Sequence, residues 1–161
     1  MDRFHVICVD DQTDILFQLV HDLAPLAKWV NIKPCSDAQS AQAWLEKIDS
    51  EGNYPCVVVS DHNMPGQNGV DWLQTVSLDR RFRHTKKVML SKTPTNEMLI
   101  EAINKAYVDR FFAKPWDKDE LLHQVRVLLT EYIFDKGIDY APLQKNLDPE
   151  TVFKYLQDVT F

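Results

Sequence analysis

Five short apolar runs alternate with helix-like segments over most of the chain, and this alternation limits the possible folds more than any other feature. The runs are continuous and rich in β-branched residues, as is typical of strands that are covered on both faces. We therefore expect five buried strands. The runs occupy residues 6–9, the weaker 30–33, 57–59, 88–90 and 110–113.

The segments between these runs carry apolar residues at the spacing of an amphipathic helix. This spacing recurs in residues 15–23, 41–48, 68–78, 98–103 and 121–132. The order is a strand followed by a helix, repeated five times over residues 4–134. It predicts an α/β fold with a parallel sheet, helices on both faces and right-handed crossovers.

Signals for helix starts accompany several of these segments. The stretches 36–39 (Ser-x-x-Gln) and 117–120 (Asp-x-x-Glu) match the capping box, in which the first side chain accepts a hydrogen bond from the first helical turn. Thr93-Pro94 combines a capping residue with a proline suited to the first helical position. We expect helices to begin directly after Ser36, Thr93 and Asp117.

Residues 135–161 differ from the repeat. The stretch 135–147 shows no clear period, whereas Asp148-Pro149 precedes apolar residues at helical spacing. We therefore divide the chain into a domain over 1–134 and an extension over 135–161, which comprises a linker and one short amphipathic helix. This helix is expected to pack on the domain or to begin a segment beyond the given sequence.

The composition excludes several classes of protein. With 45% hydrophobic residues the chain is too apolar to remain unfolded, and no apolar run approaches the ~20 residues of a membrane span. The net charge is −6 and no long run of lysine and arginine occurs, so direct nucleic-acid binding is not indicated. The N-terminal residues lack a signal-peptide cleavage site, and we expect a cytoplasmic location. The 3 cysteines form no C-x-x-C pair, and their odd number argues against a disulfide framework.

Polar side chains stand where four of the predicted strands end. Asp10 and Asp11 follow the first strand, Asp61 follows the third, Ser91 ends the fourth and Lys114 follows the fifth. In an open α/β sheet the carboxyl ends of the strands lie at one edge, and ligands bind there. We therefore expect three carboxylates, one hydroxyl and one ammonium to meet at this edge.

These groups suit the transfer of a phosphoryl group. Three neighbouring carboxylates repel one another unless a cation holds them ionised, and oxygen ligands of this kind favour Mg²⁺. A hydroxyl and a lysine ammonium both suit phosphoryl oxygens. Asp61 is therefore a candidate nucleophile that accepts a phosphoryl group, while the metal ion and Lys114 neutralise the charge.

The motifs that contain these residues closely resemble those of the receiver domain of two-component response regulators. The matching segments are 9–11, 61–69 with the pattern D-x-x-M-P-x-x-x-G, 89–91 and 111–115. The resemblance covers about residues 3–134. It implies a flavodoxin-like (β-α)5 fold whose five-stranded parallel sheet has the order 2-1-3-4-5.

The resemblance also implies a phosphoacceptor and a metal site. Asp61 corresponds to the phosphoacceptor of the family. Asp10 and Asp11 correspond to the acidic pair that binds Mg²⁺, with Asp61 as a further ligand. The backbone carbonyl of Asn63 corresponds to the one that joins the metal shell.

A second group of matched residues is implied to respond to the phosphoryl group. Lys114 corresponds to the lysine of the family, and its peptide bond to Pro115 is expected to be cis. Ser91 corresponds to the switch hydroxyl, and Phe111 to the aromatic ring that turns inward when the hydroxyl moves. Lys92 departs from the family, in which a small residue usually follows the switch hydroxyl, and we expect it to shield the site from water.

The implied phosphoryl donor is a histidine kinase or a phosphotransfer protein, and the implied output partner or output domain stays unnamed. Such a protein is no enzyme beyond its own phosphorylation and dephosphorylation. One alternative is a phosphatase that forms an aspartyl-phosphate; phosphatases resembling the haloacid dehalogenase family carry D-x-D on the first strand, which here ends in D-D-Q. The other is a receiver-like interaction module that is never phosphorylated, and the intact acidic set with Lys114 argues against it.

Overall fold

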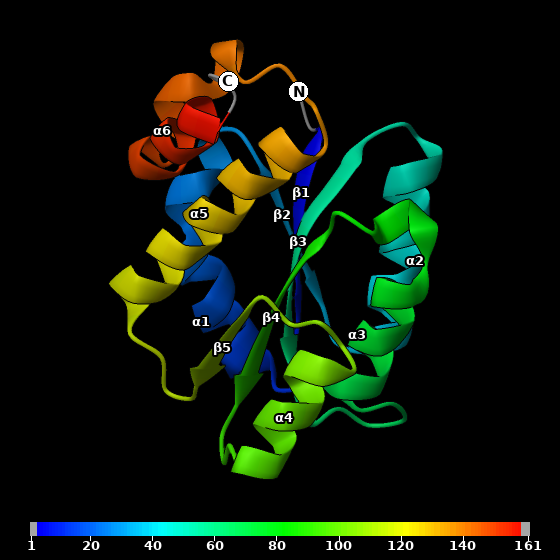
Figure 1. The fold of residues 1–161 in the computed structure, drawn as a ribbon. Helices are drawn as coiled ribbons and strands as arrows, with labels where there is room; N and C mark the ends of the chain where they lie inside the picture. The colour runs from blue at the N-terminus through cyan, green and yellow to red at the C-terminus, as the bar shows by residue number, and fades with distance from the viewer. Residues whose placement is uncertain (1–2, 159–161) are drawn as a thin grey trace.

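Five parallel strands form one sheet in the computed structural model, which describes residues 3–158 (Figure 1). Their order across the sheet is β2-β1-β3-β4-β5. The predicted parallel sheet with the order 2-1-3-4-5 is therefore confirmed. The strands are β1 (Phe4–Val9), β2 (Asn31–Cys35), β3 (Tyr54–Asp61), β4 (Lys86–Ser91) and β5 (Arg110–Ala113).

Helices cover both faces of the sheet, with α1 and α5 on one face and α2, α3 and α4 on the other (Figure 1). Within residues 3–158, no helix combines the length and the apolar character needed to cross a membrane. The helices of the repeat are α1 (Thr13–Leu23), α2 (Ala38–Ser50), α3 (Gly69–Leu78), α4 (Asn96–Asn104) and α5 (Lys118–Asp135). Shorter 3₁₀ helices are η1 (Ala24–Lys28), η2 (Arg80–Phe82) and η3 (Ala141–Asn146).

The residues of β1 alternate between the two halves of the core, because successive side chains of a strand point to opposite faces of the sheet. Val6 and Cys8 belong to the half beneath α1 and α5, while Ile7 and Val9 belong to the half beneath α2, α3 and α4. All four side chains are buried. A strand covered on both faces needs an apolar residue at every position, which explains the continuous runs in the sequence.

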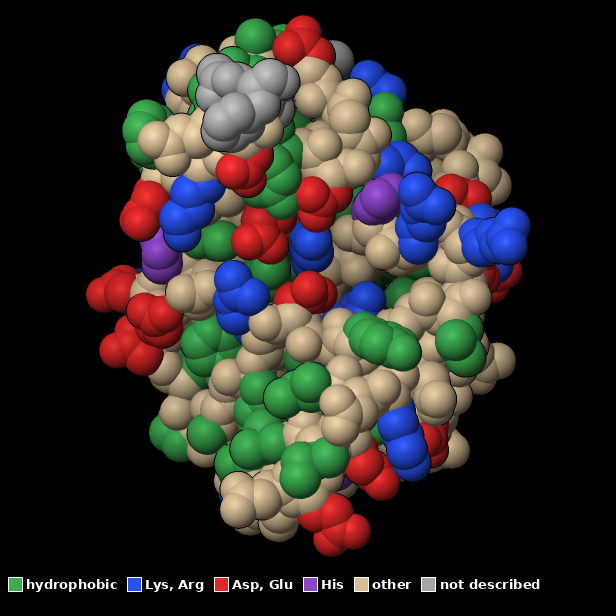
Figure 2. All heavy atoms as spheres, in the orientation of Figure 1, with side chains coloured by type: hydrophobic (Ala, Val, Ile, Leu, Met, Phe, Trp, Pro, Cys, Tyr) green, Lys and Arg blue, Asp and Glu red, His purple; other side chains and the backbone are tan. Residues whose placement is uncertain are grey.

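Apolar side chains remain exposed along α4. Ala102 is the buried residue of this helix, whereas Ile100 and Ile103 are 58% and 59% exposed and Tyr107, just beyond the helix, is 62% exposed. Figure 2 shows apolar side chains gathered on the surface over α4 and β5. We call Ile100, Ile103 and Tyr107 the α4 patch.

The predicted helix starts are partly correct. Asp117 caps α5 as predicted, because its side chain accepts a hydrogen bond from the first turn of the helix. Two other predictions are wrong by one or two residues: Asp37, not Ser36, caps α2, and Thr95, not Thr93, caps α4. Each stretch offers a second side chain that can accept this bond, and the path of the backbone decides which one does.

The extension lies against α5. Its helix α6 (Pro149–Asp158) confirms the predicted C-terminal helix, and Leu147 and Val152 are buried in the same half of the core as α1 and α5. Phe134 of α5 stacks on Tyr140 and Tyr155, with ring centroids 5.0 and 4.7 Å away. The extension therefore adds to the core of the domain.

Candidate functional site

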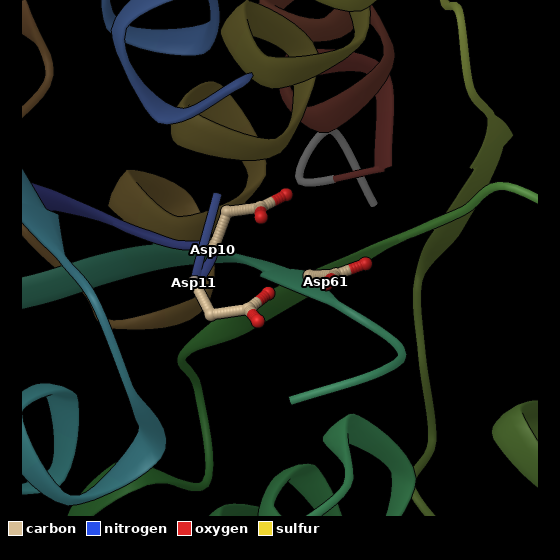
Figure 3. A group of neighbouring side chains, drawn as sticks. All are labelled: Asp10, Asp11 and Asp61. Carbon is tan, nitrogen blue, oxygen red and sulfur yellow. The ribbon is translucent and has the colours of Figure 1, made fainter. Parts of the chain in front are cut away.

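Three aspartates meet at the carboxyl edge of the sheet, where β1 and β3 end (Figure 3). Asp10 and Asp11 follow β1, and Asp61 is the last residue of β3. Each of them offers a carboxylate oxygen within 4.8 Å of the others. Asp10 and Asp61 are buried, whereas Asp11 is exposed. The fold therefore brings together the three carboxylates that the strand ends predict.

An ammonium group lies between two of these carboxylates. Lys114 Nζ donates hydrogen bonds to Asp10 Oδ2 at 2.7 Å and to Asp61 Oδ1 at 2.8 Å. The backbone amide of Lys114 donates to the carbonyl of Ser91 at 2.8 Å, which ties the ends of β4 and β5 together. The Lys114–Pro115 peptide bond is cis, as predicted.

Backbone contacts shape both sides of this cluster. The Gln12 amide donates to Asp10 Oδ1 at 2.9 Å, so both carboxylate oxygens of Asp10 have partners. On the other side the β3–α3 loop closes tightly, with a hydrogen bond of 2.8 Å from the Gly69 amide to the carbonyl of His62. A Cβ atom at residue 69 would collide with the backbone carbonyl of Asp61, which explains the glycine at the end of the D-x-x-M-P-x-x-x-G motif.

The predicted switch residues lie on neighbouring strands. Ser91 is 1% exposed, and its Oγ has no hydrogen-bond partner among the residues that the structure describes. Met89 pairs with Phe111 across β4 and β5, and both belong to the half of the core beneath α2, α3 and α4. Because side chains alternate along a strand, Ser91 faces the same side of the sheet as Met89. Ser91 and Phe111 therefore share one face.

The carboxylates outnumber the cation, and this imbalance affects proton binding. Burial raises the pKa of the Asp61 carboxyl, and the charge of Asp10 raises it further, against the lowering effect of the hydrogen bonds from Lys114 and the Asn63 amide. Burial alone would lower the pKa of the Lys114 ammonium, but its bonds to Asp10 and Asp61 outweigh burial and raise it. Lys114 therefore stays charged, while Asp61 carries negative charge that one lysine does not fully compensate.

This cluster has the chemistry of a site for a hard divalent cation. Its oxygens come from Asp10, Asp11 and Asp61, without nitrogen or sulfur ligands in the cluster. Oxygen-only sites of few protein ligands suit Mg²⁺, which keeps several waters and shares its shell with phosphate. Burial, the main cause of the raised pKa of Asp61, and the charge of Asp10 both disfavour its ionised form, which a bound cation would stabilise.

A cavity of about 670 Å³ opens beside the cluster. Its wall includes predicted site residues, among them Asp61, Asn63, Lys92 and Lys114. It also includes Pro115, whose cis bond was predicted, and residues that sequence reasoning missed, which are Gln12, Ile15, Gln18, Asp22, Trp116 and Lys118. The only signal for some of these was their position directly after Lys114.

The family follows from a comparison with known proteins. The model of the response regulator receiver domain matches residues 6–126, which include all the predicted site residues. The chain therefore belongs to the response regulator receiver domain family. Members of this family are phosphorylation-dependent signalling domains of two-component systems rather than classical enzymes, and they bind Mg²⁺ at an acidic pocket.

Individual relatives differ in how much of their length the match covers. The chemotaxis protein CheY of Pseudomonas aeruginosa is 28% identical over 134 residues, which are 81% of this chain and 96% of that protein. CheY-3 of Vibrio cholerae is 28% identical over 68% of this chain and 80% of its own length. The hydrogenase transcriptional regulatory protein HoxA of Cupriavidus necator is 31% identical over 75% of this chain, but only 23% of HoxA is covered.

Solved structures agree with the fold. The signal receiver domain of an HD domain-containing protein from Pseudomonas fluorescens is 27% identical, and the match covers 81% of this chain and 97% of that one with a TM-score of 0.68. The BeF3-activated DrrB receiver domain is 22% identical with a TM-score of 0.65, and the match covers 80% of this chain and 98% of that one. At this identity the likeness supports the fold alone.

Proposed function

We propose that this chain is a switch in a two-component phosphorelay of the cytoplasm and that Asp61 is its phosphoacceptor. The observation that carries this proposal is the position of the Asp61 carboxylate at the end of β3. One of its oxygens lies 2.8 Å from the Lys114 ammonium, and Asp10 and Asp11 supply carboxylate oxygens within 4.8 Å of it. This arrangement presents a nucleophile together with the charges that a phosphoryl group needs.

The donor is the phosphohistidine of a histidine kinase or of a phosphotransfer protein. An Asp61 oxygen forms the new bond to phosphorus while the bond from phosphorus to the histidine nitrogen breaks, and that nitrogen keeps the electron pair. Asp10, Asp11, Asp61 and the Asn63 carbonyl hold Mg²⁺, which supplies positive charge at the phosphoryl oxygens when it is bound. Lys114, which is hydrogen-bonded to Asp10 and Asp61, supplies a second positive charge.

Phosphorylation then changes a distant surface through Ser91 and Phe111. The buried Ser91 hydroxyl moves toward the phosphoryl oxygens and gains the hydrogen-bond partner that its surroundings do not provide. The half-buried Phe111 ring turns into the space that the hydroxyl leaves, which is a two-state change of packing. The affected surface comprises α4 with its exposed patch, β5 and α5, and an output partner or output domain binds there.

Two other functions predict different chemistry from the same residues. A phosphatase that forms an aspartyl-phosphate would hydrolyse a small phosphoester continuously. A receiver-like interaction module would never bind a phosphoryl group. The raised pKa of Asp61 and the bonded Lys114 favour the switch over the module, because a module without phosphorylation gains nothing from crowded carboxylates.

The test is incubation of the chain with acetyl phosphate and Mg²⁺, followed by intact mass and by an assay of p-nitrophenyl phosphate turnover. The proposal predicts that one phosphoryl group is added with Mg²⁺ and that none is added when EDTA replaces Mg²⁺ during the incubation. It also predicts no sustained turnover of the phosphoester. Sustained turnover would support the phosphatase, and an unchanged mass under all conditions would support the interaction module.

A further inference from the structure

Asp22 is a buried carboxylate that lies outside the acidic cluster. Asp22 lies near the end of α1 and is 3% exposed. Its Oδ2 accepts a hydrogen bond from Trp116 Nε1 at 2.9 Å, and its Oδ1 accepts one from Gln18 Nε2 at 2.7 Å. Both of these donors are neutral, and His21 Nδ1, which is charged only when protonated, lies 3.6 Å from Oδ1. A buried carboxylate whose hydrogen bonds come from neutral donors stabilises a fold poorly compared with an apolar side chain of similar size.

The bond from Trp116 connects two parts of the site. Trp116 follows Lys114 after a single proline, in the loop between β5 and α5. Asp22 belongs to α1, the helix that follows Asp10 and Asp11. The hydrogen bond therefore joins the loop that carries the ammonium to the helix that follows the acidic pair, across 94 residues of sequence.

The Trp116 ring packs against the half of the core beneath α1 and α5, and apolar packing of this kind is non-directional. The cavity of about 670 Å³ has Asp61 and Lys114 in its wall together with Gln18, Asp22 and Trp116. On the side that faces the cavity, apolar contacts do not fix the distance between the loop and α1. A directed hydrogen bond to a buried carboxylate can fix it instead.

We propose that Asp22 and Trp116 are positioning residues that hold Lys114 in place for phosphoryl transfer. The Trp116–Asp22 hydrogen bond fixes the β5–α5 loop on α1, and the bond from the Lys114 amide to the Ser91 carbonyl fixes its other side. With both hydrogen bonds in place, Lys114 Nζ stays between Asp10 and Asp61. This inference rests on the proposed function of Asp61.

The test compares substitutions that remove the hydrogen bond with one that keeps it. Trp116→Phe removes only the N–H donor, Asp22→Leu removes the acceptor, and Asp22→Asn keeps an acceptor oxygen without the charge. At saturating Mg²⁺, we expect Trp116→Phe and Asp22→Leu to slow phosphorylation by acetyl phosphate roughly tenfold, an effect within the range of one directed hydrogen bond whether or not its acceptor is charged. Asp22→Asn should stay within about twofold of wild type, and the Trp116→Phe/Asp22→Leu double variant should lose no more than either single one.

Two readouts separate positioning from a general loss of structure. Mg²⁺ affinity by calorimetry should stay within about twofold of wild type, because the three aspartates remain. Trp72→Phe is the matched control: it removes another indole hydrogen bond of 2.9 Å, to Gln42, in α3 and α2. It should lower thermal stability, since Trp72 is buried, but it should leave the phosphorylation rate unchanged.

Unchanged phosphorylation rates in Trp116→Phe and Asp22→Leu would overturn the inference. It would also be overturned if Trp72→Phe lost as much rate as these variants, or if their loss of rate matched a loss of Mg²⁺ affinity. A wild type that takes up no phosphoryl group would refute the proposed function instead. Hydrogen exchange of backbone amides then tests the role of the Trp116–Asp22 hydrogen bond independently of activity. The Lys114 amide should exchange faster in Trp116→Phe and Asp22→Leu than in wild type and Trp72→Phe. Equal exchange in all four proteins would overturn the inference.

Discussion

Removal of the Asp61 charge is expected to stabilise the domain when Mg²⁺ is absent. At an effective dielectric constant of about 20, two like charges at the 4.8 Å limit that bounds this cluster repel by about 3.5 kcal/mol, and closer charges repel more strongly. Asp61 has two such neighbours, Asp10 and Asp11, and one attractive partner, Lys114, whose ion pair at 2.8 Å is worth about 6 kcal/mol on the same basis. The repulsion exceeds the attraction by about 1 kcal/mol, and the raised pKa of Asp61 has the same sign.

Asp61→Asn should therefore raise the free energy of unfolding by about 1 kcal/mol in EDTA at neutral pH, which corresponds to a Tm increase of about 2–4 °C. The amide keeps an oxygen that can accept the Lys114 hydrogen bond, so the geometry survives. The assay is thermal or urea unfolding followed by circular dichroism. Glu51→Gln, an exposed change at the end of α2, is the control and should stay within about 0.5 kcal/mol of wild type.

The dependence on pH and Mg²⁺ sharpens this prediction. The pKa of Asp61 is raised from 3.8, so the folded state holds its proton more tightly, and wild type loses stability as the pH rises from 3.8 through the raised value. The gap between Asp61→Asn and wild type should therefore widen over this window. For a dissociation constant of roughly 1 mM, Mg²⁺ at about ten times this constant should stabilise wild type by about 1.4 kcal/mol and close the gap between the two proteins. A variant less stable than wild type in EDTA would refute the charge argument.

Three further predictions concern single side chains. Asp11→Ala should weaken Mg²⁺ binding at least roughly tenfold in calorimetry, since one of three carboxylates is lost; unchanged affinity would place the metal elsewhere. Lys92→Ala should speed autodephosphorylation roughly threefold, because it opens the cavity wall to water and removes the exposed ammonium that would pair with a phosphoryl oxygen; equal or slower loss would contradict shielding. A beryllofluoride mimic should change amide exchange in α4, β5 and α5, and Ser91→Ala should suppress that change; an identical response in both would exclude coupling through Ser91.

Much of the fold could be predicted because parallel strands leave a clear pattern. A strand covered by helices on both faces must be apolar at consecutive positions, and Val6–Val9 shows this directly. Asp10, Asp61 and Ser91 could be placed together because the carboxyl ends of parallel strands share one edge. The helix caps were less certain, since Asp37 and Thr95 compete with nearby side chains for the same role.

The hydrogen bond between Trp116 and Asp22 could not be predicted from the sequence. Asp22 stands in an amphipathic helix, where an aspartate usually faces solvent, and nothing local shows that it is buried. Its partner is distant in the sequence, and the contact depends on how α1 and the β5–α5 loop pack. The stacking of Phe134 between Tyr140 and Tyr155 is of the same kind, because it depends on the direction in which the extension turns after α5.

The central claim, that Asp61 is the phosphoacceptor, is tested most directly by comparing wild type with Asp61→Asn under identical phosphorylation conditions. Both proteins are incubated with acetyl phosphate and Mg²⁺, and intact mass is recorded at several times. Wild type should gain the mass of one phosphoryl group, and Asp61→Asn should gain none, although it remains folded and at least as stable. A phosphoryl group on Asp61→Asn at the wild-type rate would contradict the assignment.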